Sequence, residues 1–245
     1  MQDKITGINA VSEALQGGRK VDLLYIQEGP AGKRIEALKA EAIRQKIPIK
    51  FIKRERLEQM AGDSWHQGVI AMVEAYRYAE LEDALVLAAR RGEPPFIVIL
   101  DGIEDPHNLG AIIRTAECAG VHGIILPKHH AAEITPAVGR ASAGAVEHML
   151  VIKATNLVST IKELKEQGLW IVGADMEGAS DYYRGSIPTP VALVIGSEGK
   201  GVRRLVKEHC DLLLRIPLLG QVNSLNASVA AALLIYEVVR QRAVL

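Results

Sequence analysis

From residue 96 onward, short apolar runs alternate with segments of helical spacing, and this alternation limits the fold more than any other feature of the sequence. The apolar runs are nearly continuous, as expected of strands whose two faces are both covered. A helix between successive strands provides the long connection that parallel neighbours need. We therefore predict an α/β fold with a mostly parallel, doubly wound sheet. The predicted strands are 96–100, 123–126, 170–174, 191–195 and 212–216, and the predicted helices are 111–119, 137–147, 157–167, 202–208 and a long last helix after Ser224.

The first part of the chain shows a second, smaller α/β pattern. A polar, charged stretch follows it, in which a helix is expected over 81–90 before Pro94-Pro95 breaks the chain sharply. We therefore expect a first domain over 1–76, a linker over 77–95 and a second domain over 96–245. In the first domain the predicted helices are 8–15, 33–46 and 57–61, and the predicted strands are 21–27, 48–52 and 69–73.

The charges are balanced overall but unevenly placed. The chain has 29 Lys plus Arg and 29 Asp plus Glu, which argues against a protein held to nucleic acid by bulk charge. Aromatic residues make up only 4%, so a binder with many base-stacking platforms is not expected. Residues 33–56, however, contain nine basic and three acidic residues, the type of footprint that suits a phosphate backbone. On charge alone, a solvated helix face is the preferred explanation.

Cysteine and histidine usage excludes several classes of protein. The two cysteines, Cys118 and Cys210, rule out a disulfide framework and a Cys-rich zinc site. The histidines lack metal-ligand spacing, so no metal site is expected. The polar N-terminus is not a secretory signal, and no apolar run reaches the roughly 18 residues of a membrane span. We expect a cytoplasmic protein without a membrane partner.

Three predicted strands end in polar, Gly-rich sequence, and strand ends are where sites form in α/β sheets. After the first, Asn108 can cap the helix that follows, and Arg114 lies within two turns of it. An arginine so placed can hold a phosphate with a bidentate fork. On spacing alone, a simple cap and a salt-bridge partner are slightly preferred.

The second strand end is Gly196-Ser-Glu-Gly-Lys-Gly201, whose glycines let the backbone approach a ligand closely. Lys200 is followed by Gly201, so the segment fits neither a triphosphate-binding loop nor a dinucleotide fingerprint. A nucleotide triphosphatase and a dinucleotide dehydrogenase are therefore disfavoured, and a plain tight turn stays the alternative.

The third strand end runs from Ile216 to Ser228 and leads into the long apolar helix. Ser224, Asn226 and Ser228 gather near the start of that helix. Capping explains one of these polar residues well but does not readily explain three.

Together, the three segments resemble the motifs of the SpoU, or TrmH-like, branch of the SPOUT methyltransferases. Each segment alone is a weak signal, but the three in this order are highly specific. The N-terminal stretches 7–15 and 66–71 resemble the family's small RNA-binding domain, which is similar to ribosomal protein L30e. The matching segments are Asn108-x-Gly110-x-x-x-Arg114, Gly196-x-Glu198-x-x-Gly201, and Ile216-Pro217 through Ser224-Leu225-Asn226-x-Ser228.

The resemblance implies a trefoil knot in the C-terminal part of the second domain, where S-adenosylmethionine (AdoMet) would bind. By analogy, Gly196, Ile216 and Leu225 line that cofactor site, with Leu218 nearby. Gly permits close approach, and Ile and Leu offer apolar surface to an adenine ring. The resemblance also implies a homodimer formed through the second domain.

The implied reaction is methyl transfer from AdoMet to a ribose 2′-hydroxyl of RNA. To act as a base, the arginine guanidinium would first have to lose a proton, and it holds that proton too tightly. We therefore expect Arg114 to be a fixed cation that holds a phosphate and stabilises the developing alkoxide. Asn108 would position Arg114 or the ribose. Glu198 would orient the second loop, and Ser224 and Asn226 would shape the third.

Within the family, the resemblance is closest to enzymes that methylate a guanosine of 23S rRNA. One alternative is a tRNA ribose 2′-O-methyltransferase with the same knot. Another is a non-catalytic RNA-binding factor for ribosome assembly, although the intact Asn108, Arg114, Glu198 and Asn226 weigh against it. The sequence alone leaves open the target nucleotide, the protomer that supplies Arg114, and free RNA or a ribosomal particle as substrate.

Overall fold

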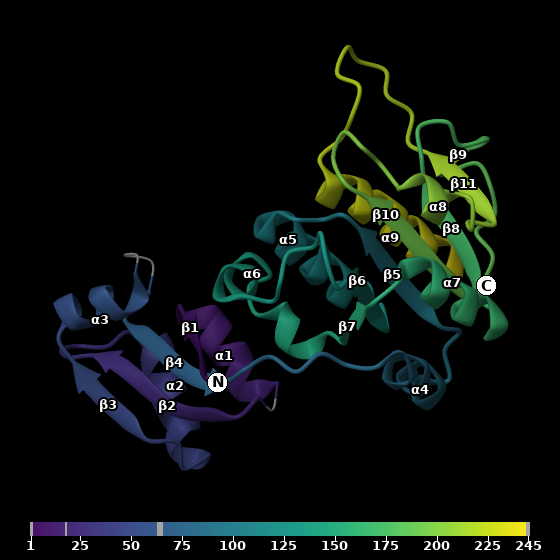
Figure 1. The fold of residues 1–245 in the computed structure, drawn as a ribbon. Coiled ribbons are helices and arrows are strands. Elements are labelled where there is room, and N and C mark those ends of the chain that lie inside the picture. Colours follow the sequence, from purple (N-terminus) through teal and green to yellow (C-terminus); the bar gives the residue numbers. More distant parts are fainter. Residues whose placement is uncertain (1, 18, 63–65, 244–245) are drawn as a thin grey trace. The chain divides into compact units, whose positions relative to one another are not determined.

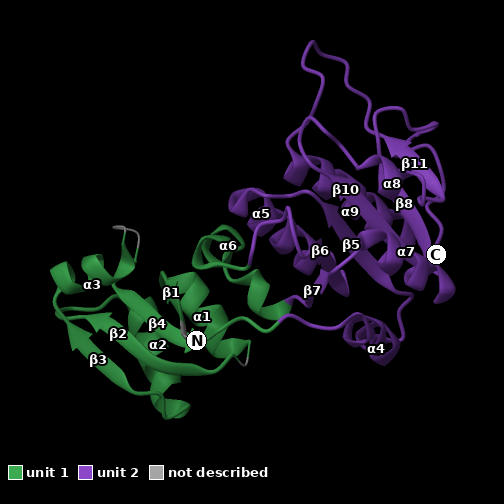
Figure 2. Cartoon of the chain, viewed as in Figure 1, with its two compact units in different colours: residues 1–77, 134–148 green, residues 78–133, 149–245 purple. Residues whose placement is uncertain are grey.

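The computed structural model describes residues 2–17, 19–62 and 66–243, which form two compact units (Figures 1 and 2). Unit 1 comprises residues 1–77 and 134–148, and unit 2 comprises residues 78–133 and 149–245. Unit 1 is therefore not one continuous stretch of chain, because its second segment is inserted in the sequence of unit 2.

Unit 1 is built on a four-stranded sheet in the order β1-β4-β2-β3. β4 pairs antiparallel with β1 and β2, whereas β2 and β3 are parallel, which leaves β3 at one edge. Helices α1 and α2 cover one apolar face through residues such as Val11 and Leu38, and Leu57 of α3 covers Ile70 on the other. The elements are β1 (Gln2–Thr6), α1 (Ile8–Gln16), β2 (Val21–Gln27), α2 (Lys33–Arg44), β3 (Ile49–Ile52), α3 (Arg54–Ala61) and β4 (Val69–Glu74).

The segment 134–148 is held in unit 1 by charged side chains. It forms α6 (Pro136–Ala141) and a 3₁₀ turn, η1 (Ala145–His148), instead of the single helix predicted over 137–147. Gly144, at φ 92°, separates the two, and a Cβ there would lie 2.4 Å from a side-chain atom of Glu13. Arg19 donates to Glu147 at 2.9 Å, to Asp3 at 2.7 Å and to a backbone carbonyl of β4. The largely buried guanidinium of Arg19 thus links the segment 134–148 to β1 and β4 of the same unit.

Unit 2 contains a seven-stranded sheet in the order β7-β6-β5-β10-β8-β11-β9, and every paired neighbour is parallel (Figure 1). This confirms the predicted parallel α/β sheet. The short strands β7 and β9 were not predicted. The elements are α4 (Leu81–Arg91), β5 (Phe96–Asp101), α5 (Pro106–Cys118), β6 (Gly123–Pro127), β7 (Val151–Ala154), α7 (Leu157–Glu166), β8 (Trp170–Ala174), β9 (Ser180–Asp181), β10 (Val191–Gly196), α8 (Arg204–Lys207), β11 (Leu212–Arg215) and α9 (Ala227–Arg242).

Both faces of this sheet are covered, which explains its continuous apolar runs. Ile97 and Ile99 of β5 and Val194 of β10 pack with α4, α7 and α8 in one core cluster. The alternate residues Val98 and Leu193 are also fully buried and point to the opposite face. On that face α9 packs against β10, and α5 packs against α9. Across the described residues, no helix has the length and apolar character to span a membrane.

The predicted start of the helix over 111–119 is wrong. α5 begins at Pro106, and its cap is Asp105, whose side chain accepts a hydrogen bond from the His107 N–H at 3.0 Å. Proline suits the first helical position because its missing N–H is not needed there. Asn108 therefore lies inside α5 and does not cap it. α9 begins at Ala227, after Ser224 as predicted, and its cap is Asn226.

Candidate functional site

Three loops leave the carboxyl ends of β5, β10 and β11 in unit 2, where β5 and β10 are neighbours and β8 separates β10 from β11. Gly196 at the end of β10 lies opposite Asp101 at the end of β5 in the parallel register, so the first two loops start at the same level. The third loop leaves β11 and leads to α9 (Figure 1). The predicted site segments therefore meet at one edge of the sheet, as expected for parallel strands.

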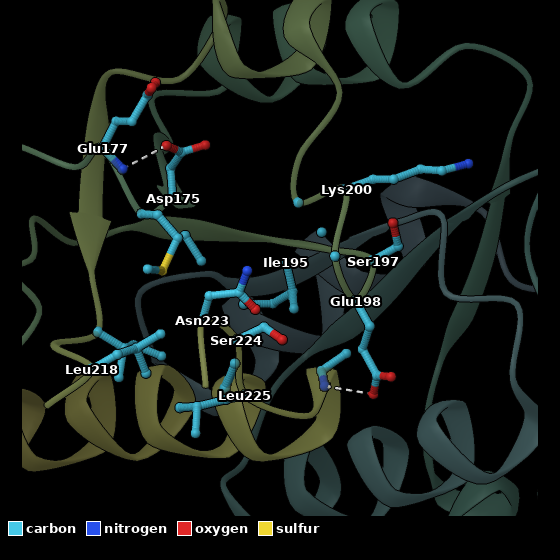
Figure 3. A pocket seen from close by; sticks show the side chains of 18 of the residues that line it. Asp175, Glu177, Ile195, Ser197, Glu198, Lys200, Leu218, Asn223, Ser224 and Leu225 are labelled. Atoms are coloured by element: carbon cyan, nitrogen blue, oxygen red, sulfur yellow. Dashed lines mark hydrogen bonds between the residues drawn. The ribbon is translucent and has the colours of Figure 1, made fainter. Parts of the chain in front are cut away.

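Glu198 joins the three loops through a single carboxylate oxygen. Its Oε1 accepts hydrogen bonds from Asn108 Nδ2 at 3.0 Å, Asn226 Nδ2 at 2.6 Å and the Ala227 backbone N–H at 3.1 Å. Asn226 Nδ2 also donates to Asn108 Oδ1 at 2.9 Å. In Figure 3 the Glu198 carboxylate points to the first turn of α9. A carboxylate is favourable there because the helix N-terminus carries partial positive charge.

Asn226 has a second task as the cap of α9. Its Oδ1 accepts from the Ser228 and Val229 N–H groups at 2.9 and 3.3 Å, and from the Ser228 hydroxyl at 2.6 Å. One asparagine thus fixes the start of α9 and the position of Glu198. Two of the three polar residues in the third segment are explained by this cap. Ser224 is exposed and stands outside the network.

The second loop is closed tightly on itself and anchored below. The Gly201 N–H donates to the Ser197 carbonyl at 2.9 Å, and a Cβ at Gly196 would lie 2.1 Å from the Gly201 carbonyl carbon. Only glycine fits at 196 without moving backbone. Asp101, which is 1% exposed, accepts from Arg203 Nε at 2.6 Å and from the Arg203 N–H at 2.8 Å. Sequence reasoning missed this anchor, whose only signal is an acid directly after an apolar strand.

A cavity of about 350 Å³ lies between the second and third loops and the end of β8 (Figure 3). All four residues predicted to hold a cofactor line it, and so do Glu198 and Ser224 of the predicted catalytic set. Asn108, Arg114 and Asn226 are not among its lining residues. The lining residues that carry the argument are Gly196, Ile216, Leu218 and Leu225, with Ile195 and Leu214 completing the apolar wall.

Three charged residues of the cavity wall were not predicted. Lys207 Nζ lies 2.8 Å from both Asp175 Oδ1 and Glu177 Oε2. The hydrogen bond with Asp175, and to a smaller extent the one with Glu177, raises the pKa of Lys207, so its ammonium stays charged. The sequence pattern does not indicate this charged cluster, because Asp175 and Lys207 are far apart in the chain.

Arg114 is exposed on α5, and its side chain forms no hydrogen bond or ion pair with any residue that the structure describes. It follows Asn108 by six residues, which rotates it about 120° around the helix from the Asn108 side chain. The structure therefore brings Asn108, Glu198 and Asn226 together but leaves Arg114 on another face. Within the described ranges, no group of His, Cys, Asp or Glu could hold a metal ion.

Comparison with known proteins finds matches over nearly the whole chain. The model of the SpoU rRNA Methylase family matches residues 95–236, and a model for RNA 2′-O ribose methyltransferase substrate binding matches residues 4–79. The Bacillus subtilis protein YacO, assigned to the TrmH family of tRNA/rRNA methyltransferases, is 48% identical over 98% of this chain and 96% of its own. A TrmH-family relative from Staphylococcus haemolyticus is 44% identical over 97% of this chain and 95% of its own.

Solved structures agree with these matches. The SpoU methyltransferase AviRb from Streptomyces viridochromogenes, in complex with AdoMet, superposes with a TM-score of 0.82 at 26% identity and covers 99% of this chain and 91% of its own. An AdoMet-bound rRNA methyltransferase from Sinorhizobium meliloti superposes with a TM-score of 0.79 at 27% identity, covering 98% and 87%.

Proposed function

Because the chain belongs to the SpoU rRNA methylase family, we propose that it transfers a methyl group from AdoMet to a ribose 2′-hydroxyl of RNA, with a guanosine of 23S rRNA as the target. The observation that carries the proposal is the Glu198 network, which joins Asn108, Asn226 and the start of α9 beside the cavity. In domain terms, residues 1–76 would bind RNA, 77–95 would link, and 96–245 would carry out the transfer.

The cavity fits AdoMet in size and chemistry. Pockets for ligands of this size start at about 300 Å³ and combine apolar walls with a few fixed polar groups. Ile216, Leu218 and Leu225 offer apolar surface, and Gly196 lets the second loop close tightly where it lines the cavity. When bound, AdoMet supplies an electrophilic methyl group. The residues that would hold it are Gly196, Ile216, Leu218 and Leu225.

The protein's own residues would position the ribose and stabilise charge. Glu198 holds the Asn108 and Asn226 side chains at hydrogen-bonding distance, so neither has to reorganise during the reaction. Arg114 has all of its donors free within the described structure, and it would hold a phosphate and stabilise the alkoxide that develops at the 2′-oxygen. Ser224 would shape the cavity rim.

We propose further that a second copy of the chain completes the site. Arg114 does not face the Glu198 network of its own protomer, and α9 exposes an apolar stripe of Val229, Leu233 and Tyr236, of which the first and last are 47% and 49% exposed. A homodimer that covers this stripe would bury α9 and allow Arg114 to serve the partner's site. Mixed dimers of Arg114→Ala and Glu198→Ala should then regain methyl transfer that neither variant shows alone. No gain on mixing would place Arg114 in its own protomer's site.

The substrate is tested with radiolabelled AdoMet and, separately, bulk tRNA and large-subunit rRNA that lack modifications. Label in rRNA at one position that resists alkaline cleavage supports the proposal. Label in tRNA would retain the chemistry and change the substrate. Absence of AdoMet binding would favour a non-catalytic RNA-binding factor. The trefoil knot and the cytoplasmic location remain predictions from the sequence.

A further inference from the structure

We propose that the outer edge of β3 binds unpaired RNA, with Phe51 as the platform for one base and the lysines that flank it in the chain as phosphate contacts. This β3-edge surface consists of Lys39, Lys46, Lys50, Phe51 and Lys53. The inference rests on the proposed RNA methyltransferase function, and it names both the part of unit 1 that holds the substrate and the form of RNA that it takes.

Phe51 is placed where packing does not need an aromatic ring. The chain has two phenylalanines; Phe96 is 1% exposed in the core of unit 2, whereas Phe51 is 52% exposed. β3 is the last strand of its sheet, so in the described structure no strand pairs with its outer side. Lys39 Nζ lies 5.3 Å from the centre of the Phe51 ring, a cation–π contact. An exposed ring beside an ammonium combines the two groups that a nucleotide needs.

The structure also sorts the nine basic residues of 33–56. Two arginines bond to neutral side chains, Arg34 to Asn9 and Arg56 to Gln59. Lys33, Lys46, Lys50 and Lys53 are exposed and form no hydrogen bond or ion pair with the described residues through their side chains. The cations that carboxylates leave free therefore include the three that flank Phe51 in the chain. Those paired with carboxylates are Lys39 with Glu36 at 2.7 Å, Arg44 with Glu41 at 2.5 Å and Arg54 with Glu58 at 2.8 Å.

Unpaired RNA fits this surface better than a duplex does. Base faces are open for stacking only where the strand is unpaired, and every base has such a face. Lysines on an edge strand can also serve to block pairing with another chain. That role explains Lys50, which lies on β3, but it does not explain an exposed Phe51, which would favour unwanted association.

The test measures binding of the full-length chain to two fluorescent probes, a short oligouridine and a blunt RNA duplex of equal length. Phe51→Ala should weaken oligouridine binding roughly 5- to 150-fold and change duplex binding little. Phe51→Trp should keep the affinity, and its added indole fluorescence should be quenched on binding. Val86→Ala, at a residue of α4 that is 47% exposed, is the matched control and should bind like the wild type.

The lysines are tested through salt dependence. The double variant Lys50→Gln with Lys53→Gln should reduce the slope of log affinity against log salt by about 1.4, since each contact with a single strand contributes about 0.7. Lys162→Gln, on the exposed side of α7, should leave the slope unchanged.

Several results would overturn the β3-edge surface. These are wild-type oligouridine affinity in Phe51→Ala, an equal loss on the duplex, and a wild-type chain that binds neither probe. AdoMet binding is measured on the same samples by calorimetry. A wild-type chain that binds oligouridine through Phe51 but neither binds AdoMet nor methylates RNA would overturn the proposed function and leave the surface standing.

Discussion

The two edges of the seven-stranded sheet are both rich in polar side chains, yet they differ in what those side chains bind. At the amino-terminal edge, His122 Nδ1 accepts from the Phe96 N–H at 3.0 Å and its Nε2 lies 3.0 Å from a Glu93 oxygen. Arg242 donates to the Pro95 carbonyl at 2.9 Å, and its guanidinium lies 4.9 Å from the Phe96 ring centre. The side chains at this edge therefore bind other groups of the protein itself.

At the carboxyl edge the polar groups are fixed but keep free capacity. Glu198 Oε1 accepts three hydrogen bonds, whereas its Oε2 has no partner among the described residues. Within the same described ranges Arg114 has none either, and a cavity of about 350 Å³ lies beside the network. The difference teaches that a high density of polar side chains does not by itself mark a site. Preorganised groups that still have free donors or acceptors beside a cavity do.

The largest expected effect is the loss of methyl transfer when Arg114, on the helix that follows the carboxyl edge, is replaced. Replacing it with Ala removes the proposed stabiliser of the alkoxide, and methyl transfer should fall about 100- to 1,000-fold. AdoMet affinity, measured by calorimetry, should not change, because Arg114 does not line the cavity. Arg90→Ala, at an exposed position of α4, is the control. Near wild-type transfer in Arg114→Ala would remove Arg114 from the reaction.

A second variant perturbs the backbone of the carboxyl edge. Gly196→Ala places a Cβ against the Gly201 backbone, so the second loop has to shift. A displacement of this kind costs about 100-fold in transfer when it misplaces reacting groups. Gly220→Ala, in the third loop, has open space around its added Cβ and should behave as wild type. Equal activity of both variants in a methyl-transfer assay would show that the tight loop is not required.

The third prediction concerns the Glu198 network. Glu198→Ala leaves Asn108, Asn226 and the Ala227 N–H without their common acceptor. We expect the free energy of unfolding in urea to fall by about 0.5–1.5 kcal/mol, because water can reach the groups that lose their acceptor, together with a loss of methyl transfer. Glu104→Ala, at an exposed position of the first loop, serves as the comparison. Unchanged stability and unchanged methyl transfer in Glu198→Ala would mean that Glu198 is not needed to position Asn108, Asn226 and the start of α9.

The smallest effect is expected at the amino-terminal edge, as a pH dependence of stability. Burial lowers the pKa of His122 below its ordinary 6.5, although the hydrogen bond with Glu93 opposes the shift. The unfolded chain then binds the proton more readily, so the stabilising contribution is full above pH 6.5 and is lost as the pH falls through the lowered pKa.

The His122→Gln variant should therefore show a flatter stability curve than the wild type over this pH range. The curve is measured from urea midpoints at successive pH values, with His107→Gln, a substitution at an exposed position of α5, as the control. If His122 instead stabilised the fold in its protonated form, the wild-type curve would rise on acidification.

The sequence predicted the parallel sheet well, because burial of both strand faces leaves a continuous apolar run that periodicity detects. It did not predict β9, which has only two residues, nor the place of Asn108, because Asp105-Pro106 offers a competing helix start. Pairs far apart in the chain leave no local pattern. The Asp101–Arg203 anchor and the Arg19–Glu147 contact that joins 134–148 to unit 1 are of this kind.

Of the site itself, the sequence indicated which segments meet but not how. The three motif segments do converge, and Glu198 with Asn226 proves to be their junction. Arg114 lies apart from that junction because of its six-residue offset from Asn108 on α5, and the motif spacing alone did not reveal this separation.

The most direct measurement is calorimetric titration of AdoMet into the wild-type chain, Gly196→Ala and His122→Gln at a pH above about 7, where the histidine is neutral in both states. We expect AdoMet to bind the wild type and His122→Gln alike and to bind Gly196→Ala about tenfold or more weakly, because the cavity lies at the carboxyl edge. Equal binding by Gly196→Ala, or loss of binding in His122→Gln with its fold intact, would contradict the assignment of the site to that edge.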